Sequence, residues 1–200
     1  MGNKEIRNLN EKIEIRSVQE NDNNTATLEG YIAKFNSPTT LWQGYNEQLE
    51  PHCFDKTLAD GHNIFLLYAH DWTKPLASTN TGTLVLTVDD IGLHFVATVD
   101  KNISYVSDTV ALITGGLTVG CSFGFYIISD NEVYDSATET WTDTILEVQL
   151  LEGSVLSNPQ YSDTMVSARG KDKVEEYKRE LQNQKDNELE LQLIEIEMEL

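Results

Sequence analysis

The sequence predicts a mainly β fold with short helices at its periphery, and three observations support this class. Apolar residues alternate with polar ones, or run together over a few positions, in many short stretches bounded by turn-forming residues. Before residue 170, helix signals are confined to 51–61, which Pro51 opens, and to 104–114, which Gly115 and Gly116 close. The composition is 40% hydrophobic, which is sufficient for a buried core. About eight or nine strands with two short helices fit a β-barrel or a sandwich with helices outside.

Strands are expected where alternation or a short apolar run stands between turns, namely at 13–18, 28–35, 64–69, 82–88, 93–99, 118–128, 141–156 and 165–166. Residues 64–69 are all apolar, which is typical of a strand buried on both faces. The pair 82–88 and 93–99 gives the clearest hairpin pattern. Residues 37–50 have no regular pattern and indicate a long irregular loop.

The composition divides the chain into three parts. Residues 1–11 are polar and are expected to be a flexible N-terminus, and 12–170 form the globular domain. Residues 171–200 are acidic and contain no Gly, Pro or Ser, which predicts a helical tail. Within 189–200 apolar residues mostly alternate, which would also suit a strand, but a slip in the alternation leaves several at helical spacing. A helix packed against a partner is favoured there, because so short an apolar face is not stable alone.

The net charge of −19 excludes some classes of partner. Nucleic acid and anionic membranes both attract basic proteins, so neither is expected. No apolar run approaches the ~18 residues of a membrane span, and no secretory signal is visible. Cys53 and Cys121 are expected to be buried thiols in a reducing compartment. No phosphate loop, zinc spacing or calcium loop is present, so no cofactor and no metal is expected.

A Gly-x-Ser-x-Gly string surrounds Ser122, at 120–124. In a nucleophile elbow this string lies between a strand and a helix, with the histidine later in the chain. Here the alternation continues past Ser122 as a strand, and all four histidines precede it. If Ser122 is a nucleophile, it therefore lies on a β-strand and its base comes from earlier in the chain.

His70 is the best candidate base, because it ends the apolar run 64–69, where a strand would meet a cleft. His94 is expected on the more polar face of its strand, and His52 and His62 flank the first helix as ordinary surface residues. The candidate acid is Glu152, a lone carboxylate within an apolar strand, which needs a donor if it is buried. His70 could be that donor. The alternative is that Glu152 lies on a solvated sheet face, as expected for Asp143 and Glu147.

Several short motifs, in this order and spacing, resemble the prohead serine proteases of tailed phages. They are Gly-Tyr-Ile-Ala-Lys-Phe (30–35), Pro-His-Cys-Phe-Asp-Lys-Thr-Leu (51–58), Leu-Tyr-Ala-His-Asp (67–71), Gly-Thr-Leu (82–84), Gly-Leu-His-Phe (92–95), Cys-Ser-Phe-Gly-Phe (121–125), Leu-Glu-Gly-Ser-Val-Leu (151–156) and Asn-Pro (158–159). The resemblance spans about residues 13–168. Among its departures, Gly153 stands where the family often has Val.

The resemblance implies a closed, herpesvirus-assemblin-like β-barrel surrounded by helices. It also implies a serine endopeptidase in which Ser122 is the nucleophile, His70 the general base and Glu152 the third member of the triad. Such an enzyme would cut scaffold or capsid protein, and itself, inside the assembling procapsid in the host cytoplasm, as a homo-oligomer with a dimer favoured. A non-catalytic, protease-like assembly protein is the alternative.

Overall fold

The computed structural model describes residues 4–7, 15–21, 23–118, 120–157 and Arg179. The chain divides into two compact units, Met1–Thr164 and Met165–Leu200, and every strand and helix reported below belongs to the first. The strand expected at 165–166 and, apart from Arg179, the acidic tail expected at 171–200 lie outside the described residues. No helix in the described part of the chain is long and apolar enough to cross a membrane.

The described residues form eleven strands and two short α-helices, so the expected mainly β class with peripheral helices is confirmed. The strands are β1 (Lys4–Arg7), β2 (Ile15–Glu20), β3 (Thr25–Lys34), β4 (Thr39–Trp42), β5 (Tyr45–Leu49), β6 (Phe65–Tyr68), β7 (Asp71–Ser78), β8 (Leu84–Val88), β9 (Gly92–Asp100), β10 (Gly120–Asp135) and β11 (Thr140–Leu156). The helices are α1 (Asp55–Ala59) and α2 (Ser104–Thr114), both within the segments expected from the sequence.

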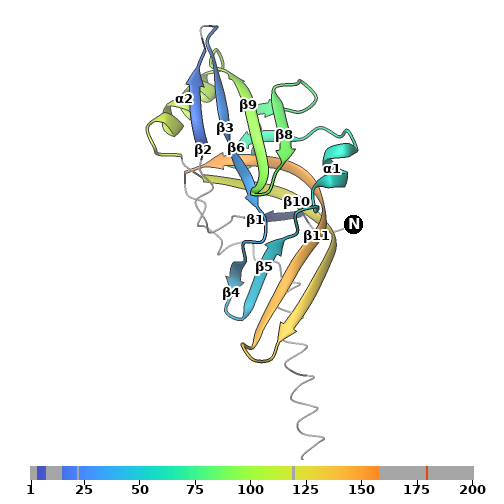
Figure 1. The fold of residues 1–200 in the computed structure, drawn as a ribbon. Coiled ribbons are helices and arrows are strands. Elements are labelled where there is room, and N and C mark those ends of the chain that lie inside the picture. The colour runs from blue at the N-terminus through green and yellow to red at the C-terminus, as the bar shows by residue number, and fades with distance from the viewer. Residues whose placement is uncertain (1–3, 8–14, 22, 119, 158–178, 180–200) are drawn as a thin grey trace, which may run out of the picture. The chain divides into compact units, whose positions relative to one another are not determined.

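The strands are divided between two sheets (Figure 1). One is antiparallel with the order β2-β3-β9-β8. The other has the path β1-β10-β11-β5-β4, with β6 also pairing β11 and β7 pairing β6. The closed barrel expected from the resemblance is not found among the described strands, because no ladder joins the two sheets.

The strand β11 lies at the centre of the larger sheet. One of its edges pairs with β10, and its other edge pairs with β5 in one part and with β6 in another. It pairs in parallel with β5 over residues 141–145 and with β6 over 152–155. Between these two ladders, the edge of β11 is hydrogen-bonded to the segment around α1. Val148 N–H donates to Cys53 O at 3.1 Å, and Leu150 N–H donates to Thr57 Oγ1 at 2.9 Å. This edge of β11 is thereby held near α1 as well as by the two strands.

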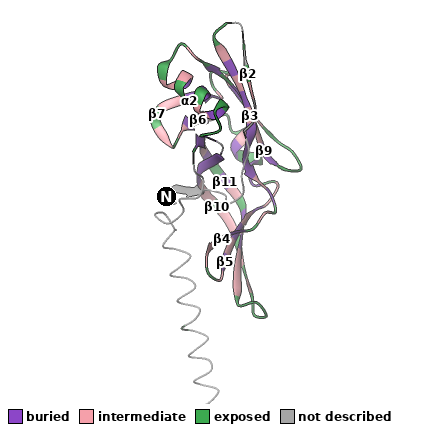
Figure 2. Cartoon of the chain, turned by 90° about the vertical axis from the view of Figure 1, so that its left-hand side faces the viewer, coloured by how far each residue is buried: buried purple, intermediate pink, exposed green. Residues whose placement is uncertain are grey.

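The core lies where the two sheets face each other, and Figure 2 shows buried residues on both of them. The Phe123 ring on β10 stacks on Phe125 at 4.8 Å between centroids and meets Phe54 edge-on at 6.1 Å. From β3, Ile32 reaches across to β11. Cys53 and Cys121 are free and buried, as expected.

The expectation of an irregular loop at 37–50 is wrong, because these residues contain the hairpin β4–β5. Tyr45, Glu47 and Leu49 alternate as buried residues on β5, and its backbone pairs with β11. Because one of these buried residues is a glutamate, the hydrophobicity of the sequence does not alternate along β5 and does not indicate a strand. In the same way β1 forms within 1–11, where a flexible end was expected, because an edge strand needs only backbone pairing, here with β10.

Gly153 packs closely against Ile32, and this close packing can be tested. A Cβ atom added at Gly153 would lie 2.5 Å from Ile32 Cδ1. Gly153→Ala is expected to lower the free energy of unfolding by about 1–3 kcal/mol through overpacking. Ile32→Val removes the Cδ1 atom, so the double variant should lose less than the sum of the two single losses, by at least about 0.5 kcal/mol. Urea denaturation of the four proteins measures this coupling. Strictly additive losses would show that the two residues do not compete for the same space.

Candidate active site

The turn between β6 and β7 places His70. Its two residues, Ala69 and His70, have φ of 52° and 59°, the left-handed values that a type I′ hairpin turn requires. Asn-Gly normally occupies such turns, because other residues are strained there. Two hydrogen bonds hold the turn against β11: Ala69 N–H donates to Val155 O at 3.0 Å, and His70 N–H donates to Ser154 Oγ at 3.0 Å.

The His70 ring meets the Glu152 carboxylate at the edge of β11. His70 Nδ1 lies 2.8 Å from Glu152 Oε1, and Ser154 Oγ–H donates to Glu152 Oε2 at 2.6 Å. The Glu152 side chain is 0% exposed, so water cannot solvate its carboxylate. The two hydrogen bonds replace the lost contacts with water. An ionised carboxylate only accepts hydrogen bonds, which assigns a proton to Nδ1 of the ring.

The second ring nitrogen of His70 has no hydrogen-bond partner among the residues that the structure describes. His70 Nε2 is buried and makes no hydrogen bond within the described part of the chain. In the neutral ring with its proton on Nδ1, Nε2 carries a lone pair and can only accept. The turn and Glu152 therefore fix a ring whose remaining nitrogen is available to take a proton from a neighbouring group.

Ser122 is brought to the same region by the β10–β11 ladder. It pairs with Ser154, and Gly124 pairs with Glu152. Directly paired residues of an antiparallel ladder lie on one face, and so do residues two apart on a strand. Ser122, Ser154 and Glu152 therefore share a face of the sheet, and all three are 0% exposed.

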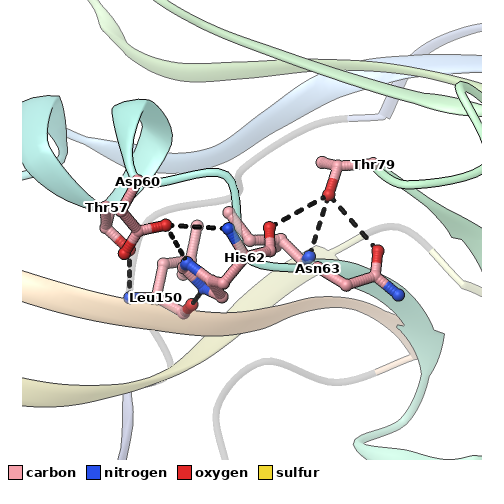
Figure 3. A network of polar contacts seen from close by, with 7 residues as sticks. Thr57, Asp60, His62, Asn63, Thr79 and Leu150 are labelled. Carbon is pink, nitrogen blue, oxygen red and sulfur yellow. Dashed lines mark hydrogen bonds and ion pairs between the residues drawn. The ribbon is translucent and has the colours of Figure 1, made fainter.

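A β-bulge at Leu151 sets the direction of Glu152. Phe125 pairs with Leu150 but Gly124 pairs with Glu152, which leaves Leu151 as the extra residue on β11. Leu150 is fixed from the side of α1, where its N–H binds Thr57 Oγ1 and its carbonyl oxygen lies 2.6 Å from His62 Nε2 (Figure 3). These contacts from Thr57 and His62 hold the backbone of Leu150, two residues before Glu152, in place.

Of the other histidines, His62 has a structural role that sequence reasoning missed. It was interpreted as ordinary surface, yet it contacts Asp60 through Nδ1 and the backbone of β11 through Nε2. His52, by contrast, is on the surface with a 77% exposed side chain. His94 is partly buried and faces Glu29, with 3.1 Å from Nε2 to Oε1.

Ser154 was also missed, although its position two residues after Glu152 on one strand was a usable signal. The expectation that Asp143 lies on a solvated sheet face is wrong, since it is 4% exposed. Its neighbours on β5 and β10 bury it, and sequence alone does not reveal which strands those are.

In this mainly β fold, a partly buried histidine contacts a fully buried carboxylate on β11, and the neighbouring strand β10 carries Ser122. The chain matches the family model described as caudovirus prohead serine protease over residues 11–180. Since this is most of the chain, the protein belongs to that family, and its class is that of the phage maturation proteases. No curated protein and no solved structure matches the chain.

The strain at the β6–β7 turn is testable. Ala69 is exposed with positive φ, so Ala69→Gly should raise the free energy of unfolding, by up to about 1 kcal/mol. The matched change in the exposed Ala59 of α1 should instead lower it by about 0.5–1 kcal/mol. Thermal or urea denaturation distinguishes the two signs. A loss of stability at Ala69 as large as at Ala59 would contradict the strained turn.

The contacts of His62 predict a pH dependence of stability. Partial burial alone would lower the pKa of His62, but its hydrogen bonds to Asp60 and to Leu150 O outweigh burial and raise the pKa. The stabilisation is complete below the unfolded-state pKa of about 6.5 and is lost as pH rises through the folded-state pKa. We expect His62→Gln to cost more stability at about pH 5.5 than at about pH 9, as measured by urea denaturation. Equal losses at the two pH values would refute this, and His52→Gln is the surface control.

Proposed function

We propose that the protein is a serine endopeptidase that uses Ser122, His70 and Glu152 to process scaffold or capsid protein, and itself, during prohead maturation. The observation that carries this proposal is the state of the His70 ring. One nitrogen binds a fully buried carboxylate at 2.8 Å, and the other is buried without a partner among the described residues. Support for the substrate class comes from the family and from the motifs in the sequence.

In the proposed mechanism, Ser122 Oγ attacks the carbonyl carbon of the scissile peptide bond while its proton passes to His70 Nε2. The imidazolium then gives that proton to the leaving amine, which departs and leaves an acyl-enzyme. Water then attacks the acyl carbon while His70 Nε2 takes its proton. The bond between that carbon and Ser122 Oγ breaks, Oγ receives the proton from His70, and the carboxylic acid product leaves. Glu152 keeps Nδ1 protonated and offsets the positive charge that the ring acquires.

Ser154 acts in this scheme as a positioning residue. Its hydroxyl oxygen accepts a hydrogen bond from the His70 backbone N–H, and its O–H donates a hydrogen bond to Glu152 Oε2. One side chain thus fixes both the turn that carries the base and the carboxylate that orients it. Because Ser122 is 0% exposed, peptide substrate reaches it only after covering residues move. We expect maturation cleavage to include such an opening step.

The proposal is tested by co-expressing the protein with its capsid precursor and measuring cleavage by mass spectrometry. Ser122→Ala should abolish processing, since in well-studied triads the group as a whole contributes about a millionfold to turnover. Glu152→Gln should retain more activity, with a loss on the order of 10⁴-fold, because the ring loses its orienting charge but the nucleophile remains.

Ser136→Ala, an exposed residue in the β10–β11 turn, is the matched control and should cleave normally. Circular dichroism of each variant separates loss of rate from loss of fold. Continued cleavage by a folded Ser122→Ala variant would eliminate Ser122 as the nucleophile. Absence of cleavage by the unmodified protein in maturing capsids would instead favour the non-catalytic assembly role.

A further inference from the structure

A group of carboxylates lies on the β10–β11 hairpin, outside the residues of the proposed triad. Glu132 on β10 pairs with Asp143 on β11, which in turn pairs with Glu47 on β5. Asp130 precedes Glu132 by two positions and so lies on the same side of β10. Carboxylates from three neighbouring strands therefore meet in one place, nine residues along β11 from Glu152.

The oxygens of this group are close enough to share one ion. Asp130, Glu132 and Asp143 each offer a carboxylate oxygen, and these atoms all lie within 4.8 Å of one another. Two oxygens bound to one Ca²⁺ at about 2.4 Å can be at most about 4.8 Å apart. The spacing is thus compatible with a single cation between them.

Asp143 provides the second, independent observation. Its side chain is 4% exposed, and its Oδ1 is buried with no hydrogen-bond partner in the described residues. Among the described residues, the other oxygen, Oδ2, has only a long contact of 3.4 Å from Tyr45 Oη. The shorter hydrogen bond of Tyr45 Oη, 2.8 Å long, goes to Glu132 Oε1. A buried carboxylate oxygen without a donor costs free energy unless a positive ligand meets it.

The surroundings of Asp143 make that cost larger. Glu47, Asp130 and Glu132 place further negative charge close to the buried Asp143 carboxylate. Like charges on three paired strands repel one another, which weakens the contacts among β5, β10 and β11. A cation among them would turn this repulsion into a link between the strands.

We propose that Asp143, Asp130 and Glu132 bind one Ca²⁺ ion, which joins the two strands of the long hairpin. All three ligands are carboxylate oxygens, the donors that hard cations prefer. Calcium is chosen over magnesium because Ca²⁺ accepts irregular, protein-rich coordination, whereas Mg²⁺ demands near-ideal octahedral geometry and keeps several waters. Water completes the coordination sphere. The role is structural and is independent of the proposed hydrolysis.

The experiment is calorimetric titration of the full chain, after treatment with EDTA, with CaCl₂ and separately with MgCl₂. We expect one Ca²⁺ site, weaker binding of Mg²⁺, and a rise in Tm on the order of 5 °C at saturating Ca²⁺. Asp143→Asn should weaken Ca²⁺ binding at least tenfold and remove the rise in Tm. In EDTA this variant should be at least as stable as the unmodified protein, because one repelling charge is gone.

Asp108→Asn, an exposed position on α2, is the matched control and should keep both the binding and the rise in Tm. Asp130→Asn is the second test variant if Asp143→Asn does not fold, and it should also weaken Ca²⁺ binding. The proposal is overturned if Ca²⁺ produces neither heat nor a change in Tm in the unmodified protein. It is equally overturned if Mg²⁺ binds more tightly than Ca²⁺, or if folded variants at both test positions bind Ca²⁺ as tightly as the unmodified protein.

Discussion

Burying the Glu152 carboxylate is the constraint on which the arrangement of the larger sheet depends. A charge removed from water requires donors, and both donors here come from defined places: the β6–β7 turn and the same strand, two residues on. The turn can reach Glu152 only because β6 runs parallel to β11 and ends beside Val155. One carboxylate is therefore positioned by three features: the pairing of β6 with β11, the strained β6–β7 turn and the bulge at Leu151.

The elements that sequence predicted well are those in which hydrophobicity alone decides the conformation. Residues 64–69 are apolar throughout, and the hairpin at 82–99 alternates cleanly, so β6, β8 and β9 follow from the pattern. The hairpin β4–β5 does not, because polar residues such as Thr39 and Glu47 are among its buried positions. Its stability comes from backbone pairing with a strand about a hundred residues later in the chain, which no local pattern contains.

The same distinction applies to the candidate site. His70 and Glu152 could be identified from the sequence because each is a polar residue at the end of an apolar stretch or within one. Burial of an ionisable side chain there is unfavourable without a partner. His62 carries no such local signal of its importance, since its partner on β11 is a backbone carbonyl from a distant segment. For Ser154, the spacing of two residues from Glu152 was a local signal, but its contact with the β6–β7 turn was not visible in the sequence. Asp143 is similar: its alternating strand suggested a solvated face, and only the neighbouring strands show that it is buried. The proposed calcium ligands likewise form no sequence motif, because Asp130 and Glu132 lie on β10 and Asp143 lies on β11.

The parallel pairing of β11 with β6 has a consequence for the timing of synthesis. His70 and Glu152 are 82 residues apart in the chain, and the strand that carries the carboxylate is the last one described. While the ribosome is still making residues before β11, the imidazole has no acid to orient it, and β6 lacks its neighbour. Pairings between such distant segments also form slowly. A nascent chain therefore lacks the contact between His70 and Glu152 until nearly all of the folded unit has been made.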